Sequence, residues 1–234
     1  MIAREGLPFI FIALAIAIVA LWGATRWDSV VLMALSVLFA LVTIAVSMFF
    51  RDPNRTCPDE LGLVVSPGDG TVLGVDTLAV HPFTGAQTLK VSIFLSVADV
   101  HVNRVPVSGR VEYVRYIPGK FFIAYLDKAS EDNEHTEIGM IDRSGRRVAF
   151  KQIAGTIARR IVCRLKGGED LRIGDRFGLI RFGSRMEVFL PVGSRVLITK
   201  GSKVKGGETS LAYLPNRVDA AQSTSISNQA VQDE

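Results

Sequence analysis

Two long uncharged stretches near the start of the chain constrain its fold more than any other feature. Residues 6–25 and 29–50 contain 20 and 22 residues without a charged side chain. At a rise of about 1.5 Å per residue, a helix of either length covers the roughly 30 Å hydrocarbon core of a bilayer. Only three residues separate the two stretches. We therefore predict a helical hairpin over residues 1–50 that anchors the chain in a membrane.

The charges that flank the two stretches predict how this anchor is oriented. Arg4 precedes the first stretch, and Arg51 and Arg55 follow the second. Positive charges favour the cytoplasmic side of a membrane, so both ends of the hairpin are expected there. Arg26, a positive charge in the connection, argues against this orientation. A cleavable signal peptide and a hairpin that enters only one leaflet are the alternatives.

After residue 50 the pattern changes to short segments typical of strands. Strands are predicted at residues 63–65, 71–75, 88–95, 110–116, 137–142, 146–152, 155–165, 177–182, 186–190 and 195–200. Residues 119–129 are expected to form either a short helix or an irregular loop. No segment keeps a helical period, so we predict a mainly β domain over residues 51–215. The polar residues 216–234 are typical of a disordered tail.

Composition limits the partners and cofactors. Cys57 and Cys163 are too few for a disulfide framework or a four-cysteine zinc site, so free thiols are expected. The three histidines are scattered without ligand spacing, and we predict no metal ion. Residues 143–185 contain 12 Lys or Arg against three acidic residues. Beside a membrane anchor this favours an anionic lipid surface over nucleic acid, with a solvated basic face as the alternative.

The pair Gly183-Ser184 stands between two predicted strands. Glycine adopts backbone angles closed to other residues, so its carbonyl can be presented to the hydroxyl of the next residue. Attack by the Ser184 hydroxyl would turn the amide into an ester, and elimination would then cut the chain and leave dehydroalanine, which hydrolyses to a pyruvoyl group. The alternative is an ordinary turn, the usual role of a Gly-Ser pair.

Two polar clusters are candidates to serve this bond. Asp69 lies in a turn between two glycines, which lets its carboxylate stand close to another backbone. Asp99, His101 and Arg104 follow a predicted strand, and Asp99 and His101 share one face if that strand continues. A histidine beside a carboxylate suits general acid–base chemistry near neutral pH. A plain turn aspartate and a polar strand edge are the alternatives.

Four stretches of the chain together resemble a known family. They are Phe49-Phe50-Arg51-Asp52-Pro53, Ser66-Pro67-Gly68-Asp69-Gly70, residues 95–106 and Phe182-Gly183-Ser184. In order and spacing they are similar to the short bacterial form of phosphatidylserine decarboxylase, over residues 49–215. The resemblance implies a β-sandwich or barrel-like domain with some helix, and an enzyme of phospholipid biosynthesis on the cytoplasmic side of the inner membrane.

The resemblance also implies a proenzyme that cuts itself between Gly183 and Ser184. Residues 1–183 would form the larger β chain and residues 184–234 the α chain, paired as a heterodimer and open to further assembly. Ser184 would become a covalent pyruvoyl group that forms a Schiff base with the amine of phosphatidylserine. That group would accept the electrons released with carbon dioxide, and the product would be phosphatidylethanolamine.

The resemblance assigns roles to some of the polar residues. Asp69 and His101 match family positions tied to self-cleavage and decarboxylation. Longer members carry a second histidine three residues after the first, where this chain has Arg104. Either His101 with Asp69 or Asp99 serves both steps, or Ser184 is activated in another way. Arg104 could instead hold the carboxylate or phosphate of the substrate.

Two other functions are compatible with the residues. A pyruvoyl enzyme acting on a soluble amino acid would not need residues 8–50, and it would turn over free serine or another amino acid without lipid. A non-enzymatic, membrane-anchored β module would use Gly183-Ser184 only as a turn, and its chain would stay intact with an unmodified serine.

Overall fold

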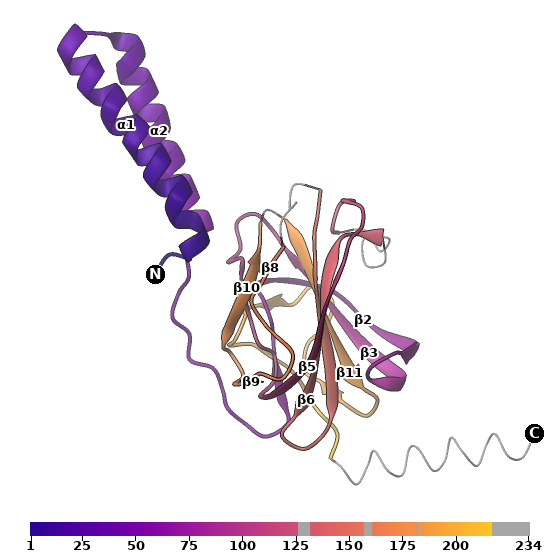
Figure 1. Cartoon of the computed structure of the whole chain (residues 1–234). Helices are drawn as coiled ribbons and strands as arrows, with labels where there is room; N and C mark the ends of the chain where they lie inside the picture. Colours follow the sequence, from indigo (N-terminus) through magenta and orange to yellow (C-terminus); the bar gives the residue numbers. More distant parts are fainter. Residues whose placement is uncertain (126–131, 157–160, 182, 217–234) are drawn as a thin grey trace, which may run out of the picture. The chain divides into compact units, whose positions relative to one another are not determined.

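The computed structural model describes residues 1–125, 132–156, 161–181 and 183–216. The chain divides into two compact units, residues 1–54 and residues 55–234. Figure 1 shows helices in the first unit and strands in the second. The predicted tail lies outside the described residues, apart from Asn216.

The first unit is the predicted hairpin of two helices. A short 3-10 turn, η1 (Arg4–Gly6), leads into α1 (Leu7–Trp27), and α2 (Val30–Phe49) follows. Both helices are long and apolar enough to cross a membrane. The chain reverses within two residues: Asp28 ends α1 in the left-handed conformation, and the hydroxyl of Ser29 accepts from the amide of Leu32 to cap α2.

Small residues line the contact between the two helices. Ala13, Ala17, Ala20 and Ala24 of α1 are buried, and the hydroxyl of Ser36 in α2 donates to the carbonyl of Ala17 at 3.0 Å. Close packing of small residues and hydroxyl hydrogen bonds are what associate helices in lipid. Most of the large apolar side chains of α2 remain exposed within this unit. The hairpin is therefore consistent with membrane association.

The second unit is built from strands. They are β1 (Leu63–Val65), β2 (Gly70–His81), β3 (Gly85–Leu95), β4 (Val102–Arg104), β5 (Gly109–Ile117), β6 (His135–Asp142), β7 (Arg147–Ile153), β8 (Ile161–Cys163), β9 (Asp170–Leu171), β10 (Arg176–Ile180), β11 (Ser184–Pro191), β12 (Arg195–Val196), β13 (Lys203–Val204) and β14 (Ser210–Tyr213). The prediction of a mainly β domain is confirmed.

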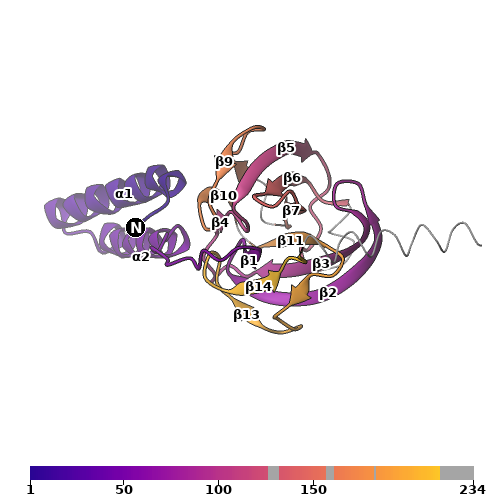
Figure 2. The same ribbon diagram turned by 90° about the horizontal axis from the view of Figure 1, so that it is seen from below.

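The strands form one large sheet and two small ones. The eight-stranded sheet has the order β13-β2-β3-β11-β7-β6-β5-β9, and β1-β14-β12 and β4-β10-β8 form sheets of three strands. The named strands pair antiparallel throughout. Figure 2 shows that the large sheet curls, with β1, β14, β4 and β10 on its open side.

The main hydrophobic core involves all three sheets. Its fully buried members include Val188 of β11, Phe150 of β7, Phe177 of β10 and Leu211 of β14. Because side chains alternate along a strand, β11 turns Met186 and its apolar partners to this core and turns the intervening residues to the opposite face. β11 is buried along almost its whole length, so it is a central strand of the domain.

Three sequence predictions need correction. Of the strand predicted at residues 155–165, the described part of the chain contains Ile161–Cys163, while residues 154–156 form a connection between sheets and residues 157–160 lie outside the described residues. Of the strand predicted at 195–200, only Arg195–Val196 forms a strand, β12; the amide of Leu197 still donates to the carbonyl of Leu211, and the chain turns at residues 200–201. The short strands β4, β9, β13 and β14 were not predicted. Residues 119–125 form no helix, and the rest of the predicted helix or loop lies outside the described residues.

Candidate active site

The bond between Gly183 and Ser184 lies in a connection between two sheets. The chain leaves β10 after Ile180 and enters β11 at Ser184. β10 pairs with β4 and β8, while β11 pairs with β3 and β7. The connections from β3 to β4 and from β7 to β8 must therefore cross between the sheets beside this one. The Gly183-Ser184 bond is in the middle connection of three.

The strand register identifies the residues that flank this bond. Ser184 pairs with Leu95, the last residue of β3. The next residue of β11 pairs with Ile153, the last residue of β7. Residues 96–101 on one side and the first residues after Ile153 on the other consequently border the bond. The first of these segments carries two of the predicted site residues.

The local geometry at the bond is unusual for an ordinary turn. Gly183 has φ +65°, in the left-handed region that glycine adopts without strain. Ser184 is fully buried, and its hydroxyl has no hydrogen-bond partner among the described residues. Buried hydroxyls are nearly always hydrogen-bonded. The serine thus keeps its hydroxyl uncommitted next to a carbonyl held at a special backbone angle.

Gly155 packs directly against the carbonyl of this bond. A Cβ atom placed on Gly155 would lie 2.1 Å from the carbonyl oxygen of Gly183 and 3.2 Å from the Cβ of Ala124. Real Cβ atoms do not approach that closely, so any larger residue would displace the carbonyl. Sequence reasoning placed Gly155 at the start of a strand and missed this contact. Its only sequence signal is a glycine that interrupts an apolar run.

His101 lies in the bordering segment, with its ring fixed by the main chain. It is buried, and its Nδ1 lies 2.9 Å from the carbonyl oxygen of Asp99. A carbonyl only accepts, so Nδ1 carries the proton and Nε2 is the basic nitrogen. The carboxylate of Asp99 accepts from the amide and hydroxyl of Ser96, at 2.8 and 2.7 Å. The shared strand face predicted for Asp99 and His101 is wrong, because β3 ends at Leu95 and this turn follows.

Asp69 is held by an ion pair that the sequence did not reveal. Both guanidinium nitrogens of Arg55 donate to its two carboxylate oxygens at 2.7 Å, and the amide of Gly206 donates to Oδ1 at 2.8 Å. Arg55 also donates to the carbonyl of Gly206 at 2.9 Å. The pair is largely buried. Bidentate, charge-assisted bonds of this kind fix both side chains, so Asp69 connects three distant segments of the domain.

Arg104 points its guanidinium to the loop before β10. Nη1 donates to the carbonyl of Gly174 at 3.1 Å. A Cβ on Gly207 would lie 2.6 Å from Cδ of Arg104, and the amide of Arg104 donates to the carbonyl of Pro67. The side chain therefore contacts backbone from two parts of the chain, at Gly174 and Gly207, which restricts the ligands it can reach.

A buried amide pair near the same end of the sheet was also missed. Nε2 of Gln152 donates to Oδ1 of Asn103 at 2.8 Å, and both residues are fully buried. Gln152 pairs with Met186, two residues beyond Ser184 along β11. Among the described residues, Nδ2 of Asn103 and Oε1 of Gln152 have no hydrogen-bond partner. A polar residue within a predicted apolar strand is the only signal in the sequence.

The opposite face of β11 carries buried charge. Arg185 and Glu187 are fully buried, with Nε of the arginine 2.9 Å from Oε1 of the glutamate. Nη2 of Arg185 also donates to the hydroxyl of Ser92 on β3 at 2.8 Å. Removing one partner of such a pair leaves an uncompensated buried charge, at a cost of about 3–5 kcal/mol. These contacts fix the strand that begins at Ser184.

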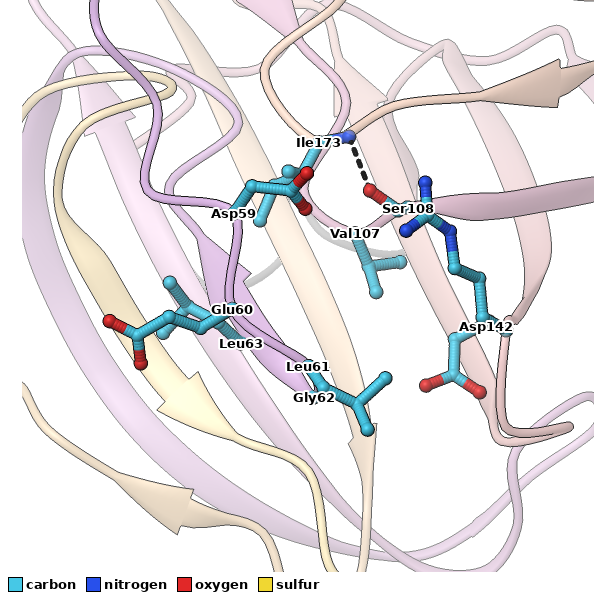
Figure 3. A pocket seen from close by; sticks show the side chains of 10 residues that line it. Asp59, Glu60, Leu61, Gly62, Leu63, Val107, Ser108, Asp142 and Ile173 are labelled. Atoms are coloured by element: carbon cyan, nitrogen blue, oxygen red, sulfur yellow. Dashed lines mark hydrogen bonds between the residues drawn. The ribbon is translucent and has the colours of Figure 1, made fainter.

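A surface pocket lies at the other end of the domain. It has a volume of about 220 Å³ and includes Asp59, Ser108 and Asp142 among its lining residues (Figure 3). Asp142 ends β6, whereas the first residue of β6 pairs with Ile153 beside the Gly183-Ser184 bond. Seven steps along a strand of about 3.4 Å each separate the two ends. This pocket is therefore not the place for chemistry at Ser184.

The two thiols and the possible metal ligands can be described from their surroundings. Cys57 and Cys163 are free, and burial raises the pKa of each thiol, which keeps both protonated near neutral pH. Within the described ranges, no three His, Cys, Asp or Glu side chains are grouped so that they could hold a metal ion.

Comparisons with known proteins agree on one family. The family model described as phosphatidylserine decarboxylase matches residues 42–212. A phosphatidylserine decarboxylase proenzyme of Pelobacter propionicus is 48% identical over 213 residues, covering 91% of this chain and 96% of the relative. Proteins of the same name from Symbiobacterium thermophilum and Burkholderia mallei are 47% and 43% identical to this chain. Each alignment covers 92% of this chain and 96% of the relative.

Proposed function

Because the chain belongs to the phosphatidylserine decarboxylase family, we propose that it cuts itself at Gly183-Ser184 and uses the resulting pyruvoyl group to convert phosphatidylserine to phosphatidylethanolamine. The observation that carries the proposal is the buried, uncommitted Ser184 hydroxyl beside a glycine at φ +65°. An ordinary surface turn has no reason to bury a serine in this way.

The proposed self-cleavage needs only the chain and one water. The Ser184 oxygen bonds to the Gly183 carbonyl carbon, the amide C–N bond breaks, and the serine nitrogen takes the hydroxyl proton. Loss of the Cα proton and rupture of the new ester release residues 1–183 with a carboxylate and leave dehydroalanine on residue 184. Its imine tautomer takes up water and releases ammonia, which leaves a pyruvoyl group.

His101 is the proposed base for this sequence. Its Nδ1 donates to the Asp99 carbonyl, so in the neutral ring Nε2 is the nitrogen that can receive a proton from the Ser184 hydroxyl or from Cα. Asp99 then acts as a positioning residue through its main chain and its turn with Ser96. His101 would serve both self-cleavage and decarboxylation, since Arg104 occupies the position of the second family histidine.

Asp69 and Arg104 are proposed to position the site. Three donors already engage the Asp69 carboxylate, an arrangement better suited to holding loops together than to moving protons. Arg104 remains a candidate for the carboxylate or phosphate of the substrate, provided that the loop at Gly174 yields its hydrogen bond. The pyruvoyl group would supply the carbonyl that binds the substrate amine and takes up the electrons released with carbon dioxide.

The location and assembly follow from the same proposal. The hairpin would hold the enzyme at the inner membrane, with both ends and the β domain on the cytoplasmic side. The basic residues of the stretch 143–185, other than the buried Arg185, would attract the β domain to the anionic lipid that contains the substrate. The two fragments would remain together as a heterodimer.

Mass spectrometry of the purified full chain tests the proposal. Two fragments are expected, and the smaller should be lighter by the mass of ammonia than a peptide that starts with Ser184. Ser184→Ala should stay intact and inactive, because alanine offers neither nucleophile nor leaving group. Purified protein in detergent should convert labelled phosphatidylserine to phosphatidylethanolamine. A single unmodified chain, or normal cutting of the Ser184→Ala protein, would sink the mechanism.

A further inference from the structure

Four exposed apolar side chains border the Gly183-Ser184 bond. Val97, Phe122, Ile123 and Tyr125 expose 53%, 40%, 58% and 60% of their surface, and we call them the apolar rim. Val97 lies in the segment that follows Leu95, the strand partner of Ser184. The other three lie on the loop that precedes β6.

This loop is fixed beside the bond by buried contacts. Asn133, fully buried, accepts from the amide of Phe122 and donates to its carbonyl, both at 2.8 Å, and donates to the carbonyl of Ala154 at 2.7 Å. Ala124 is buried against Gly155, the residue that packs on the Gly183 carbonyl. The backbone of residues 122–124 is therefore attached to the connection beside the bond.

The outward side chains of this loop are also held in place. The ring of Tyr125 meets the ring of Phe94 edge-on, with centroids 5.8 Å apart. Phe94 pairs with Arg185, the residue after Ser184. Buried Ala124 thus alternates with exposed Ile123 and Tyr125 on a fixed backbone. Clustered exposed apolar side chains on a fixed scaffold mark an interaction surface.

The geometry points to the apolar rim as a surface that docks into a lipid bilayer and brings the phospholipid head group to Ser184. This inference rests on the proposed function, in which the substrate is a bilayer lipid and the reacting residue is buried. A lipid whose tails stay in the membrane can reach a buried residue only if the surrounding surface enters the interfacial layer.

The chemistry of the rim suits that layer. Aromatic and aliphatic side chains with a flexible cation at their edge are typical of segments that lie in the membrane interface. Lys120 supplies the cation: its side chain is exposed, and Nζ lies 5.4 Å from the centre of the Phe122 ring. Its long stem lets the ammonium stay in water while the ring enters the lipid. The same chain carries two helices apolar enough for a bilayer.

Kinetics with two physical forms of one substrate test the docking. We expect Ile123→Asp in the full chain to cut itself normally, because the side chain points outward. Its kcat/KM on vesicles of phosphatidylcholine and long-chain phosphatidylserine should fall about tenfold or more, the scale set by removing one buried isoleucine side chain from lipid. Turnover of a short-chain, monomeric phosphatidylserine should stay the same.

Leu61→Asp is the matched control. Leu61 is 76% exposed and lines the pocket at the other end of β6. This substitution introduces the same charge in place of leucine, an isomer of isoleucine. The kcat/KM of Leu61→Asp on both substrate forms should equal that of the unsubstituted chain. Equal vesicle kinetics for the two variants, or equal losses on both substrate forms for Ile123→Asp, would overturn the proposal. An unsubstituted chain that decarboxylates neither form would instead contradict the proposed function.

A binding measurement keeps the inference testable if Ile123→Asp fails to fold or to cut. A fluorophore at Ile123→Cys, with both native cysteines replaced by serine, should be quenched by brominated lipids in reconstituted vesicles. The same label at Leu61→Cys should not be. Absence of quenching at position 123 would contradict docking of the apolar rim into the bilayer. Shielding of the label in detergent by association of two chains would also contradict it, because a second copy of the chain would then cover the rim.

Discussion

At Gly155, one added methyl group is expected to slow the self-cleavage of the chain. A Cβ there would stand 2.1 Å from the Gly183 carbonyl oxygen, so the carbonyl must shift from the position it holds beside Ser184. A misplacement of about 1 Å between reacting groups costs on the order of 100-fold in rate. We therefore expect Gly155→Ala to slow self-cleavage by about 100-fold, measured as the appearance of the two fragments with time.

Gly74→Ala supplies the comparison for this substitution. A Cβ on Gly74 would have the carboxylate of Asp76 as its nearest neighbour, at 3.7 Å. Both variants should unfold at temperatures close to that of the Ser184→Ala protein, which is uncut for a different reason. Self-cleavage of Gly155→Ala at the normal rate would show that the contact between Gly155 and the Gly183 carbonyl tolerates a methyl group. Loss of the unfolding transition would show that Gly155 supports the fold instead.

Among the elements, the hairpin of β2 and β3 is expected to make the domain less stable in mild acid. His81 ends β2, where its Nδ1 accepts from the amides of Phe83 and Thr84 at 3.3 and 3.4 Å, and its ring stacks on Phe189. Burial lowers the pKa of His81, with Glu137 opposing this and Lys151 adding to it. The folded hairpin therefore favours the neutral ring.

The sign of this effect follows from proton binding. Below about pH 6.5 the unfolded chain protonates His81 while the folded chain does not, so stability falls as pH drops from that value to the lower folded pKa. The thermal unfolding midpoint of the uncut Ser184→Ala protein should decrease as the pH is lowered from 7 to 5. His81→Phe, which keeps the stacking, should flatten that part of the curve. An unchanged slope would assign the acid sensitivity to other groups.

The sequence predicted best those strands that pair with neighbouring strands along their whole length. β3, β6, β7 and β11 alternate clearly and pair along their length, so their positions followed from pattern alone. Residues 155–165 have the β-branched composition of a strand, yet only Ile161–Cys163 pairs with β10. Residues 155 and 156 lie in the connection between the sheets, a consequence of topology that local propensity does not contain.

The same reasoning applies to the site. Ser184 and His101 could be proposed as site residues from the sequence because a hydroxyl and an imidazole carry their own reactivity, and that assignment stays a prediction. The contact of Gly155 with Gly183 and the ion pair of Arg55 with Asp69 could not be predicted. Each joins two segments, 28 and 14 residues apart respectively, and a hydrophobic period in the sequence carries no information about such contacts. Glycine at a close approach and arginine at an ion pair look ordinary until the fold brings them together.

At the scale of the whole molecule, the two fragments are expected to stay associated after the cut. β11, the first strand of the smaller fragment, pairs with β3 along eight residues and with β7 along five, and both neighbours belong to the larger fragment. β13 and β14 pair with β2 and β1 of the larger fragment in the same way. The smaller fragment is therefore interwoven with the larger one rather than attached to its surface.

Release of the smaller fragment would require opening the centre of the curled sheet and exposing Met186, Val188 and Leu190 to water. Fully burying one such side chain is worth about 1.5–3 kcal/mol, so separation amounts to unfolding. Fully cut protein in mild detergent should elute as one species containing both fragments, even after long dilution, and should separate only in denaturant. The elution volume of the intact Ser184→Ala protein is the reference. Appearance of free residues 184–234 without denaturant would mean that β11 does not hold the pair.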